Sequence, residues 1–273
     1  MAVLVPFGVR LTGGTARQSL MPAYDGFNSL AGFSLSLALV TNYVQTGRIR
    51  HRGDFPGRDA VLAKPLVPGS VVSDFIVQLG RVAFGFGDGL TDTQAREFLV
   101  DVFKRTIDRN LGLDPEPSTD ELSQLESSRE GDLEALAAAI EPAVRQSHAV
   151  IGPRANVINV FGGSRKIATY DDETKRYVSS WVEDKTIRRK DFSVASFNVN
   201  TGYGGVYDRD LRRVMPIKVS DETLPSAKAV LTWGIDQYAR GTNKYVDLTY
   251  WTLNALDGRP KRYMVIDAVI PGL

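Results

Sequence analysis

The chain has 273 residues, of which 43% are hydrophobic and 24% charged, a composition typical of a folded protein with room for two domains. It contains no cysteine, which excludes disulfide bonds, thiolate nucleophiles and cysteine-ligated zinc. Its net charge of +1 is compatible with binding polyanions but far from the strongly basic balance that would argue for it.

The chain start lacks the basic flank and long apolar run of an export signal. The most apolar segment, residues 27–44, is interrupted by polar residues such as Asn28 and Asn42, so it predicts a buried helix rather than a membrane span. We therefore expect a soluble, cytoplasmic protein without a membrane partner.

The first hundred residues alternate between strand and helix patterns. Residues 1–14 predict a strand, and Pro22 and Gly47 bracket a core helix. The apolar residues at helical spacing in this helix are Tyr24, Phe27, Leu30, Ala31, Leu35, Ala38, Leu39 and Val44. Residues 47–59 predict an exposed loop, and residues 60–84 predict two strands joined at Pro68-Gly69. In the second of these strands, one face carries Val71, Ser73, Phe75, Val77 and Leu79.

Helical patterns follow. The clearest helix covers residues 90–112, where Thr91 and Gln94 form a capping-box pattern and Gly112 ends the helix. Residues 114–132, rich in proline, serine and acids, predict a flexible connection into a helix at 132–146 that Pro142 kinks or divides. Because residues 108–141 contain ten acidic and two basic side chains, we interpret this region as a solvated acidic helix pair.

From about residue 150 the sequence is dominated by short strand patterns. We expect two domains: an α+β domain over 1–150 with the acidic helical segment, and a β-rich domain over 151–273. From residue 191 the order is three strands, a helix at 220–240 and two strands, with the last hairpin turning at Asp257-Gly258. This order predicts an α+β protein that ends in a small OB-like β-barrel, with an SH3-like barrel containing an inserted helix as the competing fold.

The glycine-rich stretch TGYGG, residues 201–205, is followed by a strand and therefore predicts a hairpin rather than a phosphate-binding loop. In the expected barrel, this hairpin and the last hairpin frame the ligand face and bring Tyr203 and Lys261 to one mouth. Aromatic rings beside cations suit single-stranded nucleic acid or a nucleotide. The candidate binding residues are Tyr203, Tyr207, Arg209, Arg212, Arg213, Arg259, Lys261 and Arg262. Asp208, Asp210 and Asp257 lie among them and would cancel part of their field. Pairing of these arginines with the aspartates, and a core position for Tyr207, are the structural alternatives.

No catalytic or metal-binding motif is present. GFGDGLTD, residues 85–92, lacks the dinucleotide-binding spacing, and His51 and His148 have no second histidine at metal spacing. The acids of TYDDETK, Asp171 to Glu173, predict a turn between two strands rather than a cation site. We assign no catalytic residue, metal or cofactor. The alternative is a hydrolase or nucleotide-processing enzyme whose carboxylates, Asp88, Asp171 or Asp172 among them, assemble only in the fold.

Four stretches together resemble an uncharacterised bacterial family: LTGGTARQSLMPAYDGFNSLAGF, VPGSVVSDF, IGPRANVINV and FNVNTGYGGVYD. The resemblance implies a pair of domains of unknown function, a larger N-terminal α+β part and a small barrel, and carries over no catalytic residue. It also implies a setting among mobile-element and phage-defence genes. We expect a non-catalytic binding or assembly protein, with a homo-oligomer or a protein partner left open.

Overall fold

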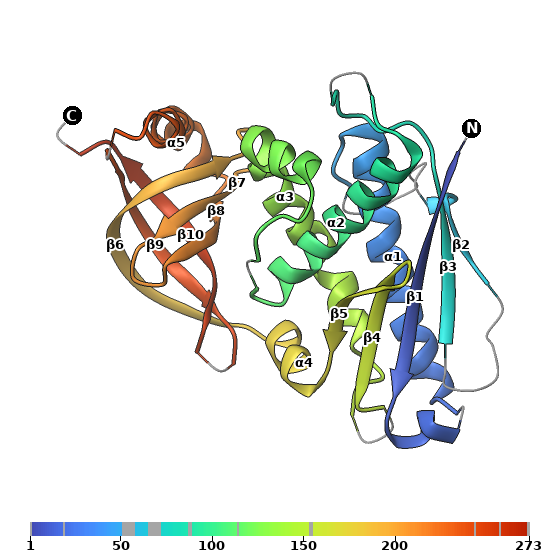
Figure 1. Cartoon of the computed structure of the whole chain (residues 1–273). Coiled ribbons are helices and arrows are strands. Elements are labelled where there is room, and N and C mark those ends of the chain that lie inside the picture. The colour runs from blue at the N-terminus through green and yellow to red at the C-terminus, as the bar shows by residue number, and fades with distance from the viewer. Residues whose placement is uncertain are drawn as a thin grey trace. The chain divides into compact units, whose positions relative to one another are not determined.

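The computed structural model describes residues 2–18, 20–50, 58–64, 72–86, 89–113, 115–152, 155–242, 244–256 and 258–271, without the side chains of Arg17 and Glu130. The chain forms two compact units, drawn in Figure 1. The first contains Met1–Ser123 and Leu136–Ser179, and the second contains Gln124–Ala135 and Ser180–Leu273. The main division therefore lies at Ser179 and not at residue 150, because the two strands that follow residue 150 belong to the N-terminal sheet.

The N-terminal unit is built on an antiparallel sheet with the order β2-β3-β1-β4-β5. Its strands are β1 (Val3–Thr12), β2 (Val61–Ala63), β3 (Val72–Leu79), β4 (Val157–Gly162) and β5 (Arg165–Tyr170). Along β1, Val5, Phe7, Val9 and Leu11 are buried, while Leu4 and Arg10 point to the other face and are exposed. This alternation is the one expected for a sheet with one covered face.

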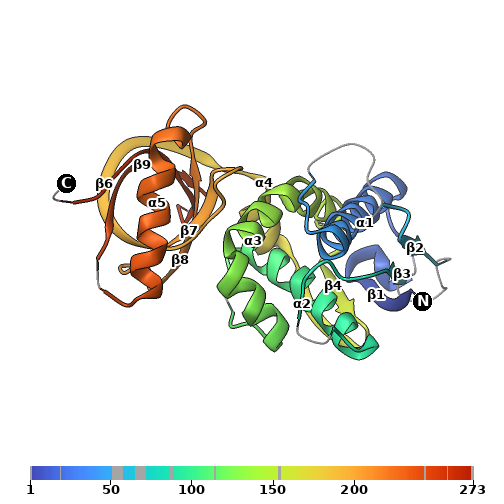
Figure 2. The same cartoon turned by 90° about the horizontal axis from the view of Figure 1, so that it is seen from above.

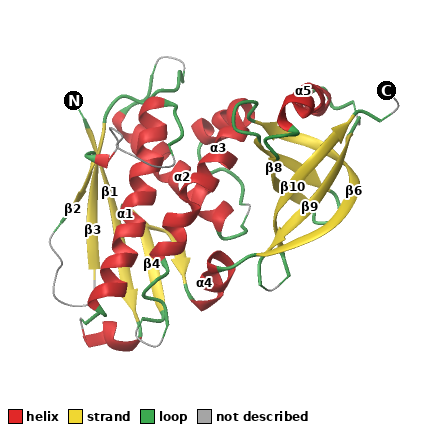
Figure 3. Cartoon of the chain, turned by 180° about the vertical axis from the view of Figure 1, so that it is seen from behind, coloured by secondary structure: helices red, strands yellow, loops and turns green. Residues whose placement is uncertain are grey.

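Helices cover that face, as Figure 3 shows from behind. They are α1 (Ala23–Thr46), α2 (Asp92–Asn110) and the later part of α3 (Asp120–Ser147), with the short helices η1 (Gly14–Gln18) and α4 (Asp172–Ser179) beside them. Phe103 of α2 makes edge contacts with Phe7 and Phe33, at ring-centroid distances of 5.4 and 5.6 Å. Gly32 lets α1 approach α3 closely, because a Cβ there would lie 2.6 Å from the carbonyl oxygen of Ala143.

The helix α1 confirms the predicted core helix but not all of its predicted core residues. Leu30, Ala38, Leu39 and Val44 are buried, together with Phe33, Leu37, Val40 and Tyr43. Tyr24, Phe27, Ala31 and Leu35 are exposed instead, with Tyr24 at 82% and Phe27 at 57%. The prediction was wrong for these four because they lie along one exposed face of the first half of α1, whereas every residue from Ser36 to Val44 is buried.

The predicted flexible connection at 114–132 is wrong, since α3 begins at Asp120. Thr119 caps it by accepting a hydrogen bond from the backbone N–H of Leu122 at 3.3 Å. The break in α3 lies at Arg129, with φ −148° and ψ 35°, and not at Pro142. Two residues later a Cβ on Gly131 would lie 2.6 Å from the backbone nitrogen of Asn198, so the helix packs closely against the chain there.

The acids of TYDDETK form the start of α4 rather than a turn between two strands. Asp171 accepts a hydrogen bond from the backbone N–H of Thr174 at 2.9 Å, and Asp172 and Glu173 lie in the first helical turn. Carboxylates are favourable there because the exposed N–H groups make a helix N-terminus partly positive.

The C-terminal unit is a closed five-stranded barrel, which confirms the predicted small barrel with an inserted helix. Its strands are β6 (Val182–Phe197), β7 (Tyr203–Asp208), β8 (Arg213–Val219), β9 (Val246–Asn254) and β10 (Pro260–Val269). They follow the order β10-β8-β7-β6-β9, in which β8 and β10 are parallel and the other pairs antiparallel.

The helix α5 (Leu224–Ala239) connects β8 to β9 and lies across one open end of the barrel, as Figures 1 and 2 show. Ala227 and Leu231 of α5 join the barrel core, which includes Phe192, Tyr250 and Tyr263. The predicted helix is therefore confirmed, including its glycine. A Cβ on Gly234 would lie 2.6 Å from a methyl group of Val194, so a residue without a side chain suits this contact.

The strand pair predicted for 60–84 is confirmed by β2 and β3, in which Ser73, Phe75, Val77 and Leu79 are buried on one face. His51, the Pro68-Gly69 turn with Val71, Asp88 and Asp257 lie outside the described residues, as does most of the predicted 47–59 loop. None of the helices in the described part of the chain combines the length and apolar composition of a membrane span.

Candidate functional sites

The outer surface of β7, β8 and β10 carries the first candidate site. Inward side chains such as Val206, Ile217 and Val265 are fully buried, and the residues between them point outward. The outward residues are Tyr203, Tyr207, Val214, Pro216, Lys218, Arg262 and Met264, all partly exposed. We call this surface the barrel face. It combines two phenol rings, two cations and an apolar background.

The ring of Tyr203 lies beside both cations of the barrel face. The Nζ atom of Lys218 lies 5.2 Å from the centroid of its ring, and the Cζ atom of Arg262 lies 5.4 Å from it. The register explains this, because Tyr203 pairs with Lys218 across β7 and β8, and Lys218 pairs with Met264, two residues after Arg262. Both cations are within cation–π distance of the one ring. The Nζ atom of Lys218 also donates to the carbonyl oxygen of Thr201 at 2.7 Å and pairs with the exposed carboxylate of Asp221 at 3.0 Å, which offsets part of its charge.

Only some of the predicted binding residues lie on the barrel face. Tyr203, Tyr207 and Arg262 do. Arg209 lies in the β7–β8 turn, where its Cζ is 3.8 Å from the ring centroid of Tyr245 and its Nη2 is 4.0 Å from an oxygen of Asp191.

The other predicted cations lie at the end of the barrel away from α5. Arg212 is in the β7–β8 turn with φ 53°, and Arg213 donates a hydrogen bond to the carbonyl oxygen of Pro260 at 3.3 Å. Arg259 closes the β9–β10 turn, its carbonyl accepting from the N–H of Ala255. Lys261 lies with its Nζ 6.0 Å from the ring centroid of Trp181.

The prediction that Tyr203 and Lys261 share one mouth is wrong. The β6–β7 turn follows the end of β6, and the β9–β10 turn follows the end of β9. These two strands are antiparallel neighbours, with Val182 opposite Asn254 and Phe192 opposite Val246. The two turns therefore lie at opposite ends of the barrel, and only the outward surface between them brings Arg262 to Tyr203.

Of the acids among these cations, Asp208 serves the barrel interior, whereas the side chain of Asp210 is 82% exposed. Asp208 is buried and accepts hydrogen bonds from Lys190 Nζ at 2.7 Å and from the hydroxyl of Tyr263 at 2.6 Å. Burial alone would raise the pKa of Asp208, but these two hydrogen bonds, together with those from the backbone N–H groups of Asp210 and Leu211, outweigh it and hold the pKa below its ordinary value. Lys190 also pairs with Asp210 at 2.7 Å. Asp208 is therefore satisfied from within and adds little negative field to the barrel face.

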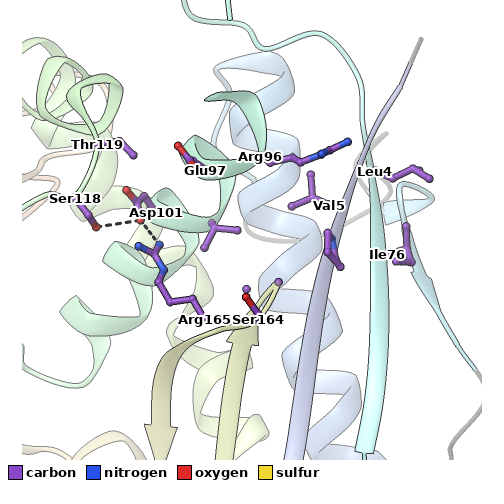
Figure 4. A pocket seen from close by; sticks show the side chains of 14 residues that line it. Leu4, Val5, Ile76, Arg96, Glu97, Asp101, Ser118, Thr119, Ser164 and Arg165 are labelled. Atoms are coloured by element: carbon purple, nitrogen blue, oxygen red, sulfur yellow. Dashed lines mark hydrogen bonds and ion pairs between the residues drawn. The ribbon is translucent and has the colours of Figure 1, made fainter. Parts of the chain in front are cut away.

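A cavity of about 750 Å³ in the N-terminal unit is the second candidate site, shown in Figure 4. The last residue of β4 that pairs with β1 is Gly162, opposite Phe7, so the first residues of β1 extend past the end of β4. The cavity opens there, between β1, α2, the start of α3 and the β4–β5 turn. We call it the Asp101 pocket. Its polar side is formed by Asp101, Ser118 and Arg165, which converge in Figure 4.

The carboxylate of Asp101 is the unusual group of this pocket, because its side chain is 0% exposed. Its Oδ1 atom accepts from Arg165 Nη2 at 2.6 Å and from the Ser118 hydroxyl at 3.1 Å. Its Oδ2 atom is buried and has no hydrogen-bond partner among the described residues. Leaving a charged acceptor unsatisfied in this way costs about 1–3 kcal/mol or more.

The remaining candidates have structural roles. His148 is buried, stacks on Tyr170 at a centroid distance of 4.3 Å, and places Nδ1 2.7 Å from the carbonyl oxygen of Val144. Burial lowers the pKa of His148 to about 4. Asp171 caps α4, and the described residues contain no cluster of three or more histidines and acids that would hold a metal ion.

Sequence reasoning missed the Asp101 pocket because its parts are distant in the chain. Asp101 and Arg165 are 64 residues apart and belong to no motif. One local signal was present: Asp101 interrupts the apolar run from Phe98 to Phe103 on the buried face of α2. A charge at such a position indicates a paired or functional group.

Comparison with known proteins gives family matches only. Residues 7–179 match the model described as "Domain of unknown function (DUF7946)", and residues 186–269 match "Family of unknown function (DUF7947)". No curated protein and no solved structure matches the chain.

Proposed function

The chain belongs to these two families of unknown function, and we propose that it is a non-catalytic protein that binds single-stranded nucleic acid on the barrel face. Because the family descriptions name no function, the proposal is based on the arrangement of the side chains. One observation carries the proposal: the ring of Tyr203 stands on the outer surface with the cations of Lys218 and Arg262 at 5.2 and 5.4 Å. A nucleobase stacks on such a ring, and the cations attract the phosphates beside it.

The topology of the barrel supports the same proposal. Around the barrel, the first strand in the chain is followed by the second, the third, the fifth and the fourth, which closes on the first. The third and fifth strands are parallel, and a helix follows the third strand. We infer an OB-type barrel from this order rather than an SH3-like one. In OB-type barrels, the second and third strands form the surface that binds oligonucleotides. Here those strands are β7 and β8, which carry Tyr203 and Lys218.

The composition of the barrel face favours binding of single-stranded nucleic acid without recognition of a specific base sequence. Tyr207 gives a second ring on β7, and Met264 and Pro216 give apolar contact. Stacking tolerates every base because each has a π face, so we expect weak sequence preference and strong salt dependence. A free nucleotide is the alternative ligand, and the enzyme alternative stays a prediction, as do the phage-defence setting and an oligomer or protein partner.

The test is fluorescence anisotropy with labelled single-stranded 12-mers of DNA and RNA at low salt. We expect Tyr203→Ala to weaken binding about 5- to 150-fold, which corresponds to one lost base stack. Arg262→Gln should reduce the slope of log affinity against log salt by about 0.7, because it removes one phosphate contact with a single strand.

Tyr238→Ala is the matched control, since Tyr238 is an exposed tyrosine of α5 away from the barrel face. Lys185→Gln on β6, with a side chain 75% exposed, is the control for loss of one positive charge. Equal effects of Tyr203→Ala and Tyr238→Ala would refute the barrel face as the binding surface. Tight binding of mononucleotides without any gain from a longer strand would favour the nucleotide alternative.

A further inference from the structure

The Asp101 pocket has the size and composition of a small-molecule site. Its volume of about 750 Å³ lies within the range of ligand pockets, about 300–1,000 Å³. Val5, Ile76 and Val100 are among its apolar lining residues. Asp101, Ser118 and Arg165 lie together on one side, whereas Arg96 extends toward β1, as Figure 4 shows. Such a pocket buries a flat apolar body and orients it through a few polar contacts.

The charges that line the pocket balance. Arg96 and Arg165 carry positive charge, and Glu97 and Asp101 carry negative charge. Because the positive and negative charges of the lining are equal in number, the pocket has no net attraction for a polyanion. Two acids without a third ligand do not make a metal site. We therefore expect an uncharged polar ligand.

The two groups on the polar side determine which ligand edge fits. Asp101 Oδ2 has no donor among the described residues, so it needs one from the ligand. Arg165 is 51% exposed and uses Nη2 for Asp101, and its planar guanidinium has further N–H groups that can donate to an acceptor on a ligand. A donor and an acceptor side by side are the N–H and C=O of an amide edge.

We propose that the Asp101 pocket binds a planar heterocycle with a lactam edge, of the kind found in guanine and uracil. The ring lies on the apolar lining, the lactam N–H donates to Asp101 Oδ2, and the lactam carbonyl accepts from Arg165. Because Oδ2 is buried, the half-exposed side chain of Arg165 is the part of the wall that moves to admit the ligand. All of these residues belong to the N-terminal unit, so this site is separate from the barrel face.

The experiment is isothermal titration calorimetry of the full chain with guanosine, uridine, adenosine and cytidine. Guanosine and uridine have a lactam N–H beside a carbonyl, whereas adenosine and cytidine do not. We expect the first pair to bind at least 10-fold more tightly than the second, because a site built around a hydrogen-bonded edge rejects ligands that leave its groups unpaired.

Two variants test the roles of the polar groups. Asp101→Asn replaces an acceptor oxygen with an N–H₂ of the same shape and should weaken guanosine binding at least 10-fold. Arg165→Gln, on a half-exposed side chain, should weaken it as well and keeps the test valid if Asp101→Asn fails to fold. Asp92→Asn, on the same helix but outside the Asp101 pocket, should leave binding unchanged.

Three results would overturn the proposal: no nucleoside binding at millimolar concentration, equal binding of all four nucleosides, or unchanged guanosine affinity in folded Asp101→Asn and Arg165→Gln. Oligonucleotide binding on the barrel face should be the same in these variants and in the original chain. Failure of the barrel-face proposal and failure of this one are therefore distinguishable.

Discussion

The buried histidine His148 predicts how the stability of the N-terminal unit depends on pH. Burial lowers its pKa from 6.5 to about 4, against smaller opposing effects of the Val144 hydrogen bond and the charge of Asp171, while the charge of Lys175 lowers it further. The unfolded chain therefore takes up a proton at a pH where the folded unit does not. The contribution of neutral His148 to the free energy of unfolding is fully present well above pH 6.5 and is lost as the pH falls toward 4.

The magnitude follows from the two pKa values. A full separation of 6.5 and about 4 corresponds to about 3 kcal/mol at pH values below both. Between pH 7 and pH 5, where the folded histidine stays mostly neutral, the expected loss is about 2 kcal/mol. This is a large fraction of the stability of an ordinary domain.

The comparison needed is with His148→Phe, which keeps an aromatic ring beside Tyr170 but has no titrating group. This variant loses the contacts to Val144 and Thr174 and is less stable at pH 7. The difference in unfolding free energy between the original chain and the variant should shrink by about 2 kcal/mol from pH 7 to pH 5.

The assay has to report on the N-terminal unit. The three tryptophans, Trp181, Trp233 and Trp251, all lie in the barrel unit, so their fluorescence does not follow it. Hydrogen–deuterium exchange of peptides from α2, measured by mass spectrometry at both pH values and corrected for intrinsic exchange, gives the local unfolding free energy. A difference between the two proteins that stays constant from pH 7 to pH 5 would show that His148 titrates alike in both states and refute the reasoning.

Two further predictions concern packing and capping in the same unit. Gly32→Ala should cost about 1–3 kcal/mol, because the new Cβ would lie 2.6 Å from backbone atoms of both Ala143 and Ser147. Gly85→Ala, where a Cβ meets nothing within 4 Å, is its control in urea denaturation followed by far-UV circular dichroism, and equal effects of the two would contradict close α1–α3 packing. Thr91→Ala should cost about 1 kcal/mol by removing the cap of α2, whose Gln94 N–H lies 3.3 Å from the Thr91 hydroxyl. The exposed Thr93→Ala should be near neutral, and a Thr91→Ala midpoint equal to that of Thr93→Ala would argue against the capping role.

Elements with strong local signals were predictable from the sequence. The ends of α2 follow from Thr91, Gln94 and Gly112, since capping and positive φ depend on neighbouring residues only. The order of strands around α5 was predictable as well, because strand and helix periods differ and glycine-rich turns separate them. The composition of 114–132 was misleading: it suggested a flexible connection, although Thr119 with the acids after it is a local start signal for α3.

Tertiary structure alone decided which residues come together at the two candidate sites. Closure of the barrel in a fixed register placed Arg262 beside Tyr203 and Lys261 near Trp181. These contacts depend on how three strands pair, and the spacing of the residues along the chain does not predict them. In the same way, β1 extending past β4 opened the pocket in which Asp101 meets Arg165. Local sequence determines helix ends and turns through short-range hydrogen bonds, whereas contacts between distant residues depend on how the whole sheet or barrel pairs.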